Sequence, residues 1–126
     1  MKRVLLAEDD PDTAAAIRVT LEERLPITVD HVTNGALVLD HAAALRPDLL
    51  ILDISMPGLS GIDVFDLIRG SDVWKTVPVL FLTAAPDKAE RAFGPAGIHI
   101  VMAKPWESDA LVMRVGDLLE LGLRAA

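Results

Sequence analysis

Short apolar runs alternate along the chain with longer segments in which apolar residues recur every three or four positions. The runs have the length of buried strands and cover residues 4–7, 27–32, 49–54, 77–82 and 98–102. Helical periodicity follows each of them, over residues 11–25, 36–45, 62–69 and 87–93 and around 111–119. Strands that alternate with helices through short connections pair in parallel by right-handed crossovers. The pattern therefore predicts a doubly wound α/β domain, a five-stranded parallel sheet with helices on both faces.

The start of the first helix carries a clear signal. Asp10 precedes Pro11, and these are a preferred helix-capping residue and a preferred first helical residue. Acidic side chains are stabilised near the positive N-terminal end of a helix dipole, so the run Glu8-Asp9-Asp10 also has a purely structural explanation. We therefore predict that Asp10 caps the helix, and that Pro26 ends it.

Polar side chains come directly after the apolar runs. Glu8 and Asp9 follow the first run, Asp53 lies near the end of the third, and Thr83 and Lys104 follow the fourth and fifth. Doubly wound sheets bind ligands beyond the carboxyl ends of their strands. In a flavodoxin-like strand order, 2-1-3-4-5, the first and third strands are neighbours, so these side chains are expected to share one edge of the sheet.

Three of these residues are carboxylates with no Cys or His partner, namely Glu8, Asp9 and Asp53. Two such charges about 4 Å apart repel by roughly 4 kcal/mol at an effective dielectric of 20. The group stays ionised only if a cation joins it, and an all-oxygen ligand set suits a hard ion. We expect Mg²⁺, with Mn²⁺ as the alternative, and the backbone carbonyl of Ser55 as a further ligand.

Four segments of the chain together resemble the receiver domain of two-component response regulators, in that family's order and close to its spacing: VLLAEDDP, LLILDISMPGLSG, VPVLFLTA and AGIHIVMAKPW. The resemblance implies that Asp53 is the phosphoacceptor and that Glu8 and Asp9 are the acidic pair, with Asp9 as a direct metal ligand. It also implies that Thr83 is the switch hydroxyl and that Lys104 binds the phosphate.

The resemblance extends to positions that modulate the reaction. It implies a cis peptide bond before Pro105 and a switch partner at residue 101, where the family usually carries Tyr or Phe and this chain has Val101. Ser55 and Ala85 occupy the positions that tune the lifetime of the acyl phosphate. Because both side chains are small, we hypothesise that water reaches the phosphate freely.

The function that this resemblance implies is phosphoryl transfer from a histidine kinase or a histidine phosphotransfer protein to Asp53. The domain would catalyse only its own phosphorylation and dephosphorylation. Phosphorylation would reshape the face formed by the fourth helix, fifth strand and fifth helix, and this face is also a candidate homodimer surface.

Two alternative functions remain. One is a receiver-like interaction module that works without phosphorylation, for which Val101 argues. The other is a phosphohydrolase with an Asp nucleophile, against which Ser55 argues, because those enzymes usually carry a second acid there.

Composition narrows the partners. The 126 residues have a formal net charge of −7, which argues against nucleic-acid binding by this segment. No apolar run approaches the ~20 residues of a membrane helix, no signal-peptide pattern is present, and the absence of cysteine excludes disulfides and thiolate metal sites. We expect a cytoplasmic receiver domain over residues 1–121, with residues 122–126 as a tail or linker.

Overall fold

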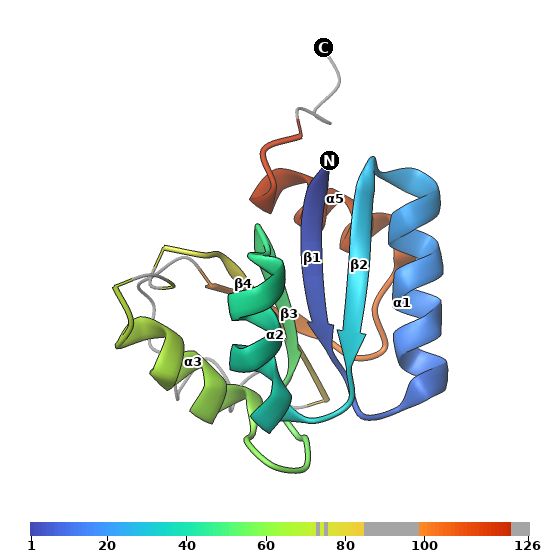
Figure 1. Cartoon of the computed structure of the whole chain (residues 1–126). Coiled ribbons are helices and arrows are strands. Elements are labelled where there is room, and N and C mark those ends of the chain that lie inside the picture. Colours follow the sequence, from blue (N-terminus) through green and yellow to red (C-terminus); the bar gives the residue numbers. More distant parts are fainter. Residues whose placement is uncertain (73, 75, 85–98, 122–126) are drawn as a thin grey trace.

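The computed structural model describes residues 1–72, 74, 76–84 and 99–121. Its centre is a five-stranded sheet with the order β2-β1-β3-β4-β5, in which all four neighbouring pairs are parallel (Figure 1). The strands are β1 (Lys2–Ala7), β2 (Ile27–Val32), β3 (Leu49–Asp53), β4 (Val79–Thr83) and β5 (His99–Ala103). The predicted fold class and strand order are confirmed.

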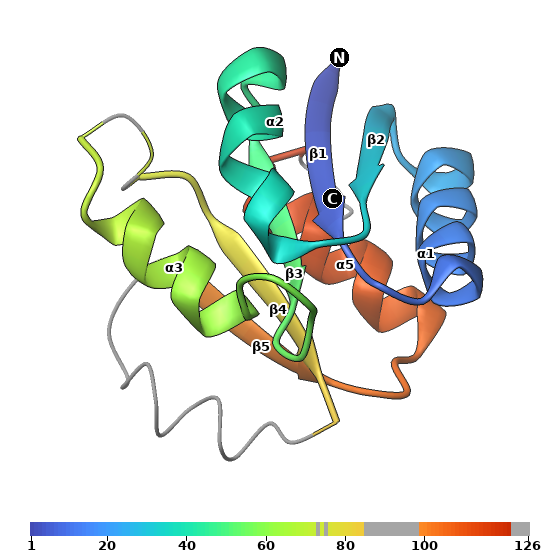
Figure 2. The same ribbon diagram turned by 60° about the horizontal axis from the view of Figure 1, so that its bottom comes forward.

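Helices cover both faces of this sheet. They are α1 (Pro11–Arg24), α2 (Val38–Leu45), which follows a short 3-10 helix η1 (Gly35–Leu37), α3 (Gly61–Arg69) and α5 (Ser108–Leu118). Figure 2 shows α1 and α5 on one side of the sheet and α2 and α3 on the other. The helix expected at residues 87–93 and the tail expected at 122–126 lie outside the described residues.

Side-chain caps define where two helices begin. The Asp10 carboxylate accepts the backbone N–H of Asp12 at 3.3 Å, and Pro11 is the first helical residue, as predicted. At α3, Ser60 and Asp63 form a reciprocal capping box, each side chain accepting the other residue's backbone N–H. These caps satisfy N–H groups that the helices themselves leave unpaired.

The strands β3 and β4, and β1 from Val4 onwards, are buried on both faces, so their successive residues enter two separate cores. In β1, Val4 and Leu6 pack towards α1 and α5, whereas Leu5 and Ala7 pack towards α2 and α3. All five residues of β3 are buried, which explains the uninterrupted apolar run. The observed β4 starts at Val79 rather than at residue 77, because Pro78 has no N–H to donate to the sheet.

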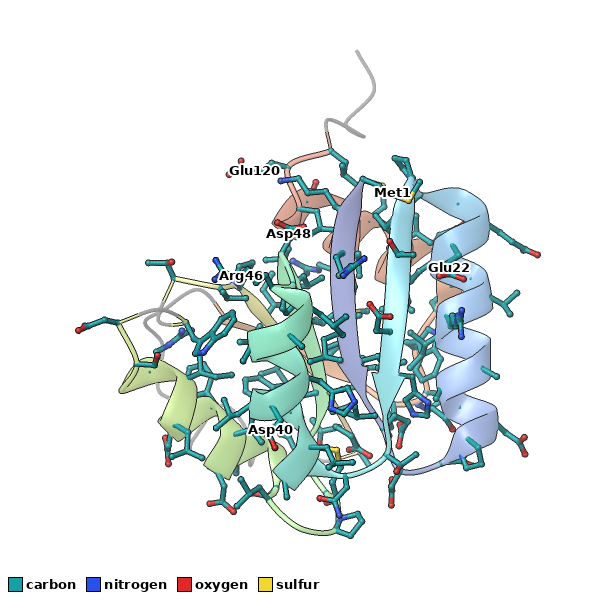
Figure 3. All side chains as sticks on the ribbon, in the orientation of Figure 1. Met1, Glu22, Asp40, Arg46, Asp48 and Glu120 are labelled. Carbon is teal, nitrogen blue, oxygen red and sulfur yellow. The ribbon has the colours of Figure 1, made fainter. Side chains whose placement is uncertain are left out.

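The edge strand β2 is protected by a side chain from α1. The carboxylate of Glu22 accepts the backbone N–H of Val29 at 2.9 Å, and Figure 3 shows Glu22 on α1 beside β2. The Glu22 carboxylate is itself oriented by an ion pair with Arg18, one helical turn earlier, in which Arg18 Nε lies 3.2 Å from Glu22 Oε1. An edge N–H that would otherwise be open to another chain is thus occupied.

None of the helices in the described ranges combines the length and the apolar character needed to span a membrane.

Because Ile51 is fully buried between β1 and β4, we predict that Ile51→Ala lowers the free energy of unfolding by about 2–5 kcal/mol through lost packing and the cavity it leaves. Leu67, on α3, is 49% exposed, so Leu67→Ala should change it by less than about 0.5 kcal/mol. Urea unfolding of both variants checks this. Equal losses would contradict the assignment of Ile51 to the core.

Candidate active site

The sheet register brings polar residues from separate strands to one edge. Ala7 pairs with Leu52, so the next residues along β1 and β3, Glu8 and Asp53, emerge beside each other. Thr83 ends β4, and it pairs with Ala103, which directly precedes Lys104. This edge is the carboxyl end of the strands, at the arrowheads of β1 and β2 in Figure 1.

Three carboxylates converge there, as predicted. Oxygen atoms of Glu8, Asp9 and Asp53 all lie within 4.8 Å of one another. Glu8 is 1% exposed and Asp53 is 8% exposed, whereas Asp9 faces solvent. The site therefore has two acids set into the protein and a third at its open side.

Lys104 binds both buried acids. Its Nζ lies 2.8 Å from Glu8 Oε1 and 3.1 Å from Asp53 Oδ2, and its backbone N–H donates to the carbonyl of Thr83 at 2.8 Å. The Lys104–Pro105 peptide bond is cis, as the resemblance implied. Partial burial alone would lower the pKa of Lys104, but the hydrogen bonds and charges of Glu8 and Asp53 outweigh it and raise the pKa above its usual value.

The charge balance of this cluster suits a divalent cation. Three carboxylates against one ammonium leave two negative charges uncompensated when all are ionised. Oxygen ligands from carboxylates are those that Mg²⁺ and Mn²⁺ accept. The residues present therefore fit such an ion, with Glu8, Asp9 and Asp53 as the side chains able to hold it.

The other predicted site residues lie around this cluster. Thr83 is buried at the tip of β4, and the Ser55 N–H donates to Asp53 Oδ1 at 3.3 Å, which ties the start of the following loop to Asp53. Val101 pairs with Phe81 and packs, half-buried, on the core under α2 and α3. Ala85 lies outside the described residues. The roles of Ser55 and Val101 in phosphate lifetime and switching stay predictions.

Asp10 stands beside the acidic pair but belongs to the helix start. The hydroxyl of Thr13 donates a hydrogen bond to its carboxylate, and this bond, with the backbone N–H groups of the first turn, lowers the pKa of Asp10 although desolvation opposes it. Its own N–H donates to Glu8 Oε2 at 3.2 Å, so the cap also helps to orient Glu8. The prediction that Asp10 caps α1 agrees with these contacts.

Sequence reasoning assigned no role to His31, which contacts the site from β2. Its Nε2 donates to the backbone carbonyl of Glu8 at 2.8 Å, and the Glu8 N–H donates to the carbonyl of Val32 at 3.1 Å. These bonds hold the backbone at Glu8 against the neighbouring strand. The strand register, in which His31 pairs with Leu6, places His31 near Glu8. The sequence alone does not provide this information, because the register requires knowing which strands are neighbours.

Comparison with known proteins finds matches over nearly the whole chain. A sequence model of the response regulator receiver domain matches residues 4–116. The chain is 35% identical over 127 residues to the transcriptional regulatory protein KdpE of Mycobacterium tuberculosis, covering 100% of this chain and 54% of KdpE. It spans about half the length of the curated relatives it matches.

Solved structures share the fold. The signal receiver domain of a signal transduction histidine kinase from Syntrophus aciditrophicus superimposes with a TM-score of 0.85 and 28% identity, covering 100% of this chain and 96% of that one. The receiver domain of a sensor histidine kinase from Pseudomonas aeruginosa superimposes with a TM-score of 0.83 and 24% identity, covering 94% of this chain and 98% of that one. That protein was crystallised with magnesium coordinated in its active site cleft.

The ion pairs of Lys104 generate a stability prediction. In metal-free protein at pH 8, Lys104→Met should lower the free energy of unfolding by about 1–3 kcal/mol, because two buried carboxylates lose their common partner. The pKa of Lys104 is higher in the folded protein than its ordinary value of 10.5. The ion pairs therefore contribute fully to stability below pH 10.5, and this contribution is lost as the pH rises through the pKa of the folded state. Urea unfolding with EDTA from pH 8 to 12 measures it.

Lys2→Met is the matched control, since Lys2 is exposed at the start of β1 and has no ion pair among the described residues. It should behave like the unchanged protein at every pH. A Lys104→Met deficit that stays constant up to pH 12 would show that lost packing, and not the charge, is responsible.

Proposed function

The chain belongs to the response regulator receiver domain family, and from this membership and the site we propose that it accepts a phosphoryl group on Asp53 from a phosphohistidine of a partner protein. The partner class is a histidine kinase or a histidine phosphotransfer protein. The observation that carries the proposal is that Asp53 lies at a strand tip, within one cluster with Glu8, Asp9 and Lys104.

The reaction follows from the chemistry of these groups. A carboxylate oxygen of Asp53 forms a bond to phosphorus while the phosphorus–nitrogen bond of the phosphohistidine breaks. The bonding electron pair leaves with the imidazole nitrogen, and an acyl phosphate remains on Asp53. Neutral imidazole departs directly when the other ring nitrogen already carries a proton, and otherwise the departing nitrogen takes a proton from water. The Lys104 ammonium, held 3.1 Å from Asp53, is placed to stabilise charge on the transferred group.

We further propose that Glu8, Asp9, Asp53 and the Ser55 carbonyl hold Mg²⁺, with Mn²⁺ as a substitute. When bound, the ion neutralises negative charge on the acids and the phosphoryl group. The convergence of the three carboxylates and the magnesium in the P. aeruginosa receiver domain support this assignment. The acids of this chain provide the ligands, and Glu8 is held in place by Lys104 and by the Asp10 N–H.

The output of the proposed reaction is a conformational bias. Phosphorylation would add a charge of about −1.5 to −2 beside Thr83 and Lys104 and draw both towards the phosphate. A pre-existing equilibrium would then shift on the face that includes β5 and α5, with Val101 as the packing partner of the switch and this face as a homodimer surface. The net charge of −7 favours protein partners over direct nucleic-acid binding by this segment.

The two rival functions make different demands on the same site. A phosphohydrolase would turn over small phosphate esters, whereas we propose that this domain catalyses only its own phosphorylation and dephosphorylation. An interaction module without phosphorylation could use the contacts of Lys104 for stability, but it would not require three carboxylates to converge beside that ammonium at one edge of the sheet. This convergence favours the phosphoacceptor function.

Acetyl phosphate with Mg²⁺ tests the acceptor directly. We expect the unchanged protein to gain the mass of one phosphoryl group by intact-mass spectrometry, and Asp53→Asn to gain none, because its amide is not a nucleophile of comparable strength. Asp12→Asn, which removes an exposed acid in the first turn of α1, should be phosphorylated normally.

Other outcomes of this experiment discriminate between the functions. A mass gain in Asp53→Asn would place the acceptor elsewhere. No gain in any protein would favour the interaction module, and sustained hydrolysis of p-nitrophenyl phosphate would favour the phosphohydrolase.

The small side chain of Ser55 gives a prediction about phosphate lifetime. Ser55→Asn should slow dephosphorylation, because a larger side chain two residues after Asp53 restricts the approach of water. The decay of the phosphorylated mass after removal of acetyl phosphate measures the rate. A rate equal to that of the unchanged protein would contradict free water access at this position.

A further inference from the structure

Two loops that are distant in the sequence pack closely beside the proposed phosphorylation site. One is the β2–α2 turn at the start of η1, formed by the cap residue Asn34 and by Gly35, and the other is the β3–α3 loop, residues 54–60. Both lie at the same end of the molecule in Figure 1. The backbone N–H of Gly35 donates to the carbonyl of Pro57 at 3.2 Å. Gly35 is buried by this contact.

The contact leaves no room for side chains at two positions. A Cβ on Gly35 would overlap the carbonyl oxygen of Leu59 and lie 2.7 Å from its carbonyl carbon. A Cβ on Gly58 would overlap the Oδ1 of Asn34, and Gly58 has a φ of +80°, which L side chains rarely adopt. Each loop thus presents a glycine to the other.

Asn34 is held in place for this contact by its own turn. Its Oδ1 accepts the backbone N–H of Ala36 at 2.8 Å and so caps η1. The atom that packs against Gly58 is therefore also bonded within its own loop. A fixed side chain sets the position of its neighbour better than a mobile one.

The β3–α3 loop is held on both sides of Ser55. At its base, the Gly61 N–H donates to the carbonyl of Ile54 at 3.0 Å, and the Ser55 N–H reaches back to Asp53. Further along, Pro57 is bonded to Gly35. The backbone that carries the Ser55 carbonyl is therefore tied to β3 at one end and to the β2–α2 turn at the other.

We propose that the turn formed by Asn34 and Gly35 is a positioning element for the phosphoacceptor site. It holds the β3–α3 loop so that the Ser55 carbonyl stays at the carboxyl edge of the sheet beside Asp53. This role rests on the proposed function, in which that carbonyl is a Mg²⁺ ligand. Among the described residues, no hydrogen bond joins Asn34 or Gly35 to the three acids, so both act through the loop.

Gly35→Ala tests the proposal, with Gly70→Ala as the matched control. A Cβ on Gly70, at the end of α3, would meet nothing closer than 3.7 Å. We expect Gly35→Ala to weaken Mg²⁺ binding by about tenfold or more, the range for lost outer-shell support, as measured by titration calorimetry with MgCl₂. Gly70→Ala should bind Mg²⁺ like the unchanged protein.

Hydrogen exchange in EDTA gives a readout that needs no metal. Gly35→Ala should speed exchange of the amides of residues 54–61, including Gly61, while amides of the central strand β3 keep their protection. Unchanged exchange there together with unchanged Mg²⁺ binding would overturn the proposal. If even the unchanged protein bound no Mg²⁺, the metal part of the proposed function would fail, while faster loop exchange in Gly35→Ala would still support the contact.

A double-mutant cycle covers the case in which Gly35→Ala does not fold. Gly58→Ala should weaken Mg²⁺ binding and loosen the loop when residue 34 is Asn. The same substitution should have a smaller effect in the Asn34→Ala variant, because Asn34→Ala removes the Oδ1 that the new Cβ of residue 58 would strike. Strictly additive effects of Asn34→Ala and Gly58→Ala would show that the two side chains do not act through this contact, and would overturn the proposal.

Discussion

The site depends on a local excess of negative charge that one ammonium only partly offsets. Glu8 and Asp53 share the Nζ of Lys104, and Asp9 stands on the open side of the same cluster. Three strand ends must stay in register for this arrangement to persist, because the charges come from the tips of three different strands, β1, β3 and β5. In the proposed function, the remaining uncompensated charge attracts a cation to this edge of the sheet, and the ammonium attracts the phosphoryl group.

The sheet supplies that register because its central strands are buried on both faces. Packing of β1 and β3 between two helical layers leaves little freedom for either strand to slide, since a shift by one residue would exchange the side chains of the two cores. The loops beyond the strands are not enclosed between two helical layers, although side chains such as Met56 and Leu59 pack on one core. Their positions come from individual contacts, such as those of His31 and Asp10 with Glu8 and of Gly35 with Pro57.

Much of this could be predicted from sequence because the relevant signals are local. The apolar runs located the strands to within one or two residues, and Asp10 with Pro11 located the start of α1. The site residues were predictable because parallel strands all end at the same edge. The shared pairing of Lys104 was not predictable, since the sequence placed Lys104 at the same edge as the acids without indicating which of them it contacts. The contacts of His31 and Asn34 join segments that carry no motif linking them.

The sequence by itself determined the order of strands and helices, and which side chains stand at the strand ends, because these follow from hydrophobic periodicity and from parallel pairing. Only the tertiary structure decided which atoms meet. Lys104 is 96 residues from Glu8 along the chain, and their 2.8 Å contact exists because β3 and β4 lie between β1 and β5 at a fixed spacing. The fit of Gly35 against Leu59 has the same origin, since close packing between separate loops depends on where the folded sheet places them.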